Sequence, residues 1–408
     1  MVQNFIFPVI SLIAAELFLR YQNPYRLWKD AFDESLVCEP DGERGWRPKP
    51  NIEFNYYHRY MRGKRRIKQN SLGLRSSNNY DLVKNKDTYR VLVFGDSTLQ
   101  GWELEEDQTI HRLVENGIAN ELQHKKVEVI PVAARNYCLG QLFTWYKSVF
   151  HEFDYDLLIY YFNENNPRRT ITFHESGKPT LLTQPVFVWS EDNGLSLCPP
   201  PTINHPNDMV YLDQNGKTVV DSGKTIITPH VWMREHLHIY CALTDLIQGP
   251  IRLRKFMDRY EIKNIEKWNT INDATEKRFP YQWEICRRIF KEWIRLARGK
   301  QAQFVIIPNL QYYHAGNNWL LTGTKHECGF NYEDIPCREY LRLIAVENEI
   351  EFFDTYQFVY ENRIDTGNFY VHPRYAFHSS EGARFQSSFI LKSISSLKNG
   401  KKVACKRI

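Results

Sequence analysis

The chain has 408 residues, of which 42% are hydrophobic and 14% aromatic, so it can bury a large core and is not an intrinsically disordered chain. The formal net charge is only +5 and the basic residues are widely spread, which gives no support for nucleic-acid binding. Eight cysteines without a CxxC motif indicate neither a disulfide scaffold nor a zinc ribbon. His326, Cys328 and Cys337 lie close in sequence without a fourth ligand at zinc-finger spacing, so we expect no metal. A disulfide between the two cysteines and free thiols both stay open.

The N-terminal segment is a candidate membrane anchor. Residues 5 to 20, FIFPVISLIAAELFLR, are mostly apolar but are interrupted by Pro8 and Glu16. They are short for a bilayer span, which needs about 20 apolar residues, and they lack the basic region and cleavage site of a signal peptide. We expect residues 1–22 to be an uncleaved anchor, with a buried amphipathic helix as the alternative. The basic residues that follow would, by the positive-inside rule, leave the body in the cytoplasm.

The rest of the chain divides by its patterning. Residues 23–86 read as an irregular lead-in with two turn clusters, GERGWRPKPN and NSLGLRSSNN. From residue 88, apolar strands alternate with amphipathic helices, which predicts a parallel sheet covered on both faces. The predicted strands are 89–95, 126–133, 156–162, 302–308 and 350–354, and the predicted helices are 109–124 with Asp107 as N-cap, 140–153, 281–298, 337–347 and 380–397.

Two segments interrupt or follow this alternation. Residues 168–277 read as a large insertion with scattered aromatics and a possible hairpin at YLDQNGKTVV. Residues 399–408 form a basic tail. We therefore expect one α/β domain over 87–398. Because the insertion starts beside the carboxyl end of a predicted strand, it is expected to supply substrate walls or a lid.

The first predicted strand ends in the sequence VLVFGDSTLQGW, which turns at Gly95-Asp96-Ser97. A serine on a tight turn at the carboxyl end of a parallel strand stands where open α/β sheets place their ligands. The turn exposes the hydroxyl, and the following backbone N–H groups face the same point. This arrangement is typical of a serine nucleophile.

These features resemble the SGNH/GDSL hydrolases, a serine esterase superfamily with a flavodoxin-like three-layer α/β/α fold. The resemblance covers most of residues 40–398 apart from the insertion. It implies that Ser97 is the nucleophile and that no metal or organic cofactor is needed. In the second block of the family, VEVIPVAARNYCLGQ here, Asn136 takes the place of a glycine whose backbone N–H holds the oxyanion. The third block appears as NENN, in which Asn165 takes the position of the oxyanion-holding asparagine.

The last family block, Asp-x-x-His before the closing helix, supplies the general base. His378 stands four residues before Gly382, close to the spacing of the family, and is preferred to His372. The positions three residues upstream hold Tyr375 and Phe369 instead of an aspartate.

The acid that normally orients the base is therefore missing from its usual place. Asp365, Glu381 or a backbone carbonyl could take this role by folding back. The loss of such an acid from a protease triad costs about 10⁴ in rate, so a weakened or lost triad stays an alternative.

The lead-in sequences RGWRPKPN and NSLGLRS resemble membrane-anchored bacterial members, whose enzymatic domain commonly faces away from the cytoplasm. We therefore expect a single-pass membrane protein with an extracytoplasmic catalytic domain. The expected activity is cleavage of a carboxylic ester, of a small molecule or a carbohydrate, through an acyl-serine intermediate. The alternatives are an O-acyltransferase acting on a cell-surface polysaccharide and a catalytically decayed binding or scaffold protein.

Overall fold

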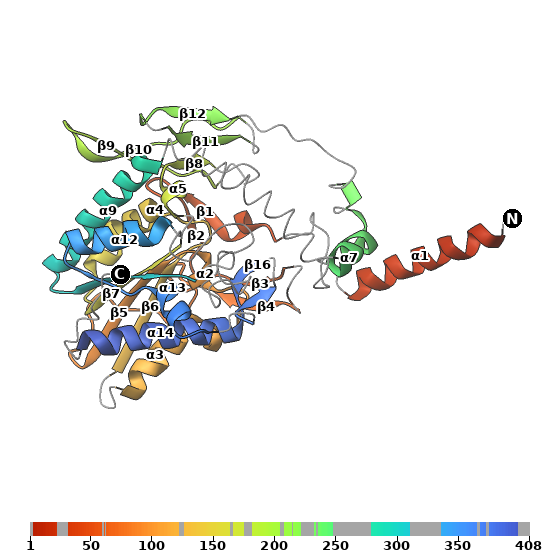
Figure 1. Ribbon diagram of the computed structural model, residues 1–408, viewed down its shortest axis with the longest axis horizontal. Helices are drawn as coiled ribbons and strands as arrows, with labels where there is room; N and C mark the ends of the chain where they lie inside the picture. Colours follow the sequence, from red (N-terminus) through yellow and green to blue (C-terminus); the bar gives the residue numbers. More distant parts are fainter. Residues whose placement is uncertain are drawn as a thin grey trace.

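A computed structural model gives the architecture of most of the chain (Figure 1). The described residues are 3–22, 32–58, 61, 63–121, 126–163, 166–174, 182–204, 208–213, 215–221, 232–233, 236–247, 279–310, 336–364, 368–372 and 375–398.

The centre of the molecule is a parallel five-stranded sheet with the order β14-β13-β7-β5-β6. Counted along the chain and read from the β6 edge, this is the flavodoxin-like order 2-1-3-4-5. The strands read as nearly continuous apolar runs because both faces of the sheet are buried. Their bounds are β5 (Thr88–Gly95), β6 (Lys126–Ala133), β7 (Leu157–Phe162), β13 (Gln303–Pro308) and β14 (Glu351–Phe352).

Helices cover both faces of the sheet and make the three-layer α/β/α arrangement that the sequence predicts (Figure 1). Alternate side chains of β5 point to opposite faces of the sheet. Leu92 and Phe94 belong to one buried cluster, while Val91 and Val93 belong to the other. The first cluster lies under α4 (Leu139–Ser148), α9 (Phe279–Gly299) and α12 (Pro336–Glu347). The second lies under α3 (Ile110–Glu121) and α14 (Ser380–Lys398). The buried apolar side chains of α13 (Thr355–Glu361) belong to the first cluster.

One predicted cap is wrong. Asp107 does not cap α3, because it lies inside a short 3₁₀ helix, η3 (Glu106–Gln108), that precedes Thr109 and Ile110. A second 3₁₀ helix, η4 (Phe150–Glu152), likewise ends the predicted helix 140–153 early.

The lead-in is more ordered than its weak periodicity predicts. It forms two antiparallel hairpins after a 3₁₀ turn, and their strands of four residues are too short for apolar alternation to stand out. Trp46 is buried in the main core, so the lead-in packs on the α/β body. The elements are η2 (Glu34–Val37), β1 (Cys38–Asp41), β2 (Gly45–Pro48), β3 (Glu53–Tyr56) and β4 (Arg65–Lys68).

The insertion contains the hairpin expected at YLDQNGKTVV, formed by β11 and β12 around the Asp213–Gly216 turn. A three-stranded sheet of order β12-β11-β8 and a β9–β10 hairpin lie at one end of the body (Figure 1). The hairpin contacts α9, and β8 contacts α5. The elements are α5 (Asn166–Thr170), β8 (Thr172–His174), β9 (Val186–Ser190), β10 (Gly194–Cys198), β11 (Met209–Leu212), β12 (Thr218–Asp221) and α7 (His238–Ile247).

The N-terminal segment forms one helix, α1 (Gln3–Gln22), which projects from the body and contacts α7 (Figure 1). Glu16 accepts hydrogen bonds from the backbone N–H groups of His238 and Ile239, at the start of α7. None of the helices in the described part of the chain combines the length and the apolar character needed to cross a membrane.

The described residues contain no cluster of side chains suited to a metal ion. The side chains of His326, Cys328 and Cys337, and with them the possible disulfide, lie outside the described residues.

Candidate active site

The predicted nucleophile stands at the end of the central strand. β5 ends at Gly95, and α2 (Ser97–Gln100) begins at Ser97, which is partly buried. Asp96 caps this helix by accepting a hydrogen bond from the backbone N–H of Thr98 at 2.9 Å. The turn requires glycine before it, because a Cβ on Gly95 would lie 2.8 Å from Cβ of Leu99. The local sequence therefore fixes Ser97 at the carboxyl edge of the sheet.

Asp96 is itself almost fully buried, and its Oδ2 has no hydrogen-bond partner among the described residues. Burial raises the pKa of this carboxyl, while Arg169 of α5, with Nη1 3.8 Å from Oδ2, acts in the opposite direction. An arginine of the insertion thus lies directly beside the turn that carries Ser97.

The resemblance predicts two backbone N–H groups, those of Ser97 and Asn136, as donors of an oxyanion hole. Asn136 lies in a turn after β6, in which the N–H of Tyr137 donates to the carbonyl of Ala134 at 3.3 Å, and its φ is +63°. Asparagine and glycine are the residues that best tolerate this left-handed conformation. Within the described residues, the N–H groups of Ser97 and Asn136 donate to no acceptor.

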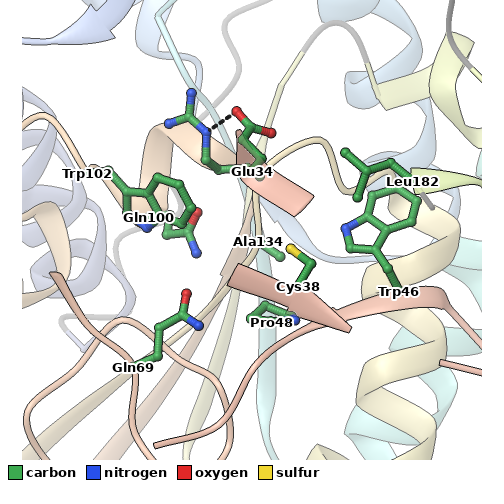
Figure 2. Close-up of a pocket in the computed structure, with 10 residues that line it drawn as sticks. Glu34, Cys38, Trp46, Pro48, Gln69, Gln100, Trp102, Ala134 and Leu182 are labelled. Carbon is green, nitrogen blue, oxygen red and sulfur yellow. Dashed lines mark hydrogen bonds and ion pairs between the residues drawn. The ribbon is translucent and has the colours of Figure 1, made fainter. Parts of the chain in front are cut away.

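The side chain of Asn136 is anchored by an acidic residue of the lead-in that sequence reasoning missed. Glu34 accepts a hydrogen bond from Asn136 Nδ2 at 2.6 Å. The other oxygen of Glu34 accepts one from Arg135 Nε at 2.7 Å, which is the dashed line in Figure 2. The two partners are about a hundred positions away in the chain, so no local pattern could have shown this contact.

Arg135 links the separate segments of the site. Its Nη1 lies 3.2 Å from Oε1 of Glu103, and its guanidinium lies over three aromatic rings at 4.7 to 5.3 Å. The rings belong to Tyr56 of the lead-in, Trp102 shortly after α2, and Phe377 beside the predicted base.

Two small cavities flank the 134–136 turn. The first is shown in Figure 2, where Trp102 lies on one side, Trp46 and Leu182 lie on the other, and Glu34 lies between them. The second, of about 20 Å³, is large enough for a water molecule. The second is lined by Trp46, Asn136, Arg169, Thr172, Phe173, His174, Leu182 and Gln184.

His378 ends β16 (Tyr375–His378), which pairs with β15 (Tyr370–His372), and it is only 3% exposed. Its Nε2 lies 2.8 Å from Oδ1 of Asn309 and 3.4 Å from the hydroxyl of Tyr161. The ring stacks on Tyr370 at 5.5 Å. Burial lowers the pKa of His378 to about 4.

No carboxylate contacts His378 within the described part of the chain. The backbone of Phe369 also interacts with its imidazole and partly offsets the effect of burial on the pKa of His378. Glu381 lies exposed in the first turn of α14, whereas Asp365 falls outside the described residues. His372 is described only as the strand partner of Tyr375.

The pairing of Ser97 with His378 and the role of Asn165 stay predictions. No hydrogen bond joins Ser97 to His378 among the described residues. Asn165 falls outside those residues, while its neighbour Asn166 is buried and donates from Nδ2 to the hydroxyl of Tyr160 at 2.5 Å. The structure thus brings Ser97, Asn136 and an arginine to one sheet edge, and places His378 over the ends of β7 and β13.

Comparison with known proteins gives distant structural similarity only. No family model and no curated protein sequence matches the chain. Among solved structures, a lipase/acylhydrolase from Enterococcus faecalis is 9% identical, with 76% of this chain and 96% of that chain covered and a TM-score of 0.35. The psychrotrophic esterase EstA from Pseudoalteromonas sp. is 7% identical, with 76% and 98% covered and a TM-score of 0.36. A GDSL-like lipase from Bacteroides thetaiotaomicron is 10% identical, with 76% and 90% covered and a TM-score of 0.33.

Proposed function

We propose that the chain is a hydrolase that cleaves a carboxylic ester through an acyl-serine intermediate on Ser97. The observation that carries the proposal is the meeting, at one sheet edge, of a serine on a strand-to-helix turn with two N–H groups that have no acceptor among the described residues. Such donors are worth most where negative charge develops in the transition state, typically about 3 to 4 kcal/mol each.

In the proposed reaction, Oγ of Ser97 attacks the ester carbonyl and its proton passes to His378. The N–H groups of Ser97 and Asn136, with the amide of Asn165 as a third donor, hold the tetrahedral oxyanion. Collapse of this intermediate breaks the bond to the alcohol oxygen, which leaves with the proton from His378. Water then attacks the acyl-serine by the same sequence and releases the carboxylic acid.

His378 has to change its hydrogen bonding to act in this way. Oδ1 of Asn309 is an acceptor only, so the 2.8 Å contact requires a hydrogen on Nε2. A base needs a free lone pair on the nitrogen that faces the serine. We therefore place the described arrangement before catalysis, and propose that the imidazole exchanges Asn309 for Ser97 when substrate binds.

The test is reaction of the purified protein with a fluorophosphonate probe, followed by location of the adduct by mass spectrometry. We expect the adduct on Ser97, and Ser97→Ala should abolish both labelling and hydrolysis of a short aryl ester. Ser196→Ala, which removes an exposed serine from β10, is the matched control and should leave both unchanged. A folded wild-type protein without labelling would favour the decayed binding protein. Transfer of the acyl group to an added sugar in preference to water would favour the acyltransferase.

We also propose that α1 holds the chain at a lipid surface. Eight large apolar side chains of this helix are 50% to 84% exposed, and burial of such surface is favourable. We expect the full chain to float with lipid vesicles in a density gradient. A chain that lacks residues 1–22 should not float with them. Equal recovery of both chains in the vesicle-free fraction would contradict it. The exposed residues are Phe7, Val9, Ile10, Leu12, Ile13, Leu17, Phe18 and Tyr21.

A further inference from the structure

We propose that Glu34 is a positioning residue of the oxyanion hole, which clamps the peptide unit whose N–H is the second oxyanion donor. The inference rests on the proposed function. The N–H of Asn136 belongs to the peptide unit that joins Arg135 to Asn136. Glu34 binds the side chains on both sides of that unit, at 2.7 Å and 2.6 Å, and so resists its rotation.

The clamp stabilises an unfavourable backbone conformation at Asn136. Asn136 has a φ of +63°, and a non-glycine residue in this region is less favourable by about 1 to 2 kcal/mol. A free asparagine side chain also forms hydrogen bonds with its own neighbouring backbone, which would favour other turn geometries. The carboxylate of Glu34 accepts a hydrogen bond from the Asn136 amide, so that this side chain no longer competes for backbone hydrogen bonds.

The partners are held firmly enough for such a role. The side chains of Glu34 and Arg135 are only 18% and 11% exposed, so their charge-assisted hydrogen bond is little screened by water. The backbone of Glu34 begins the 3₁₀ turn η2, which Asp33 caps through the N–H of Ser35. Arg135 is fixed independently by Glu103 and by the aromatic rings described above. The lead-in thus contributes directly to the site.

A double-mutant cycle tests the clamp with a short aryl ester as substrate. Glu34→Ala should lower kcat at least about tenfold with KM changed less than about twofold, because a misplaced donor weakens only transition-state binding. In the Asn136→Gly background the side chain that Glu34 holds is absent and a positive φ costs nothing. There, Glu34→Ala should change kcat less than about twofold further.

The control is Glu39→Ala, which removes an exposed ion pair with Arg47 from the same lead-in and should leave kcat unchanged. An equal loss on removing Glu34 in both backgrounds would mean that Glu34 acts through Arg135 and general stability, which overturns the inference. An unchanged kcat in Glu34→Ala overturns it as well.

Amide hydrogen exchange tests the clamp without depending on ester hydrolysis. Amide hydrogen exchange of residues 134–137 should be at least about tenfold faster in Glu34→Ala, at equal global stability, and unchanged in Glu39→Ala. Unchanged exchange in Glu34→Ala overturns the clamp even if no ester is cleaved. A wild-type protein that neither hydrolyses esters nor takes the probe would refute the proposed function alone.

Discussion

Nε2 of His378 lies 2.8 Å from Oδ1 of Asn309, the first residue after β13. The hydroxyl of Tyr161 donates to the same oxygen at 2.7 Å, so this amide oxygen serves two donors in a buried network. The predicted base is therefore fixed by neutral groups at the carboxyl ends of β13 and β7. Before catalysis, neutral groups thus hold the imidazole without the negative charge that an aspartate would supply.

The choice between two histidines is tested first. His378→Ala should lower kcat at least about 10²-fold with little change in KM, the low end for loss of a general base. His372→Ala should not, because the spacing to Gly382 assigns the base to His378. Both variants are compared with wild type by steady-state kinetics on the same ester. Loss of activity in His372→Ala alone would reverse the assignment, and indifference of both variants would refute the hydrolase mechanism.

The pH dependence follows from the burial of His378. Its pKa is lowered to about 4, so the imidazole stays neutral and able to accept a proton at higher pH. We expect kcat/KM to be level down to about pH 5 and to fall below it with a midpoint near 4, instead of near 6.5 for an unperturbed histidine.

Asn309→Asp should raise the pH midpoint at which kcat/KM falls in acid. A carboxylate at the 2.8 Å contact stabilises the imidazolium and so raises the pKa of His378. Asn309→Leu, which supplies no charge, serves as the control and should not raise it. A midpoint that stays in place in Asn309→Asp would show that a different group controls the acid limb.

The position of Gly382, four residues after His378, has a steric reason. A Cβ at this position would lie 2.0 Å from the carbonyl oxygen of Phe369 and 3.0 Å from Nδ1 of His378. Gly382→Ala should therefore lower the free energy of unfolding by about 1 to 3 kcal/mol and lower kcat through displacement of His378. Gly299→Ala is the matched control, because nothing lies within 4 Å of its added Cβ. Urea unfolding and kinetics measure both effects, and equal stability of the two variants would contradict this account.

Glu16 has a structural reason to interrupt the apolar N-terminal run. Its oxygens accept from the N–H groups of His238 at 2.9 Å and Ile239 at 2.8 Å, which would otherwise be unsatisfied at the start of α7. Glu16→Ala should destabilise α7 by about 1 kcal/mol, the usual cost of a lost cap. Amide exchange of residues 238–247 should then be about five times faster. Ser11→Ala, in the same helix, should not alter it, and unchanged exchange in Glu16→Ala would rule out the cap.

The sequence predicts the sheet and its covering helices well, because these depend on local patterns. The apolar run before Gly95 and the 3.6-residue period of α3 specify a buried strand and an amphipathic helix without reference to the rest of the chain. Parallel strands need helical crossovers, so the layered α/β class follows from the order of elements alone. The lead-in hairpins were missed because strands of four residues carry too little periodic signal.

The place of Ser97 follows from the local sequence, since a strand, a close-packed glycine and a helix cap are all encoded within a few residues of it. The conformation at Asn136 was likewise foreseeable from the tolerance of asparagine for a positive φ. The distant groups of the candidate site, in contrast, are specified by long-range contacts of the fold. Glu34 reaches Asn136 and Asn309 reaches His378 because the fold brings chain segments 102 and 69 positions apart into contact, and hydrogen bonds over such separations leave no local pattern.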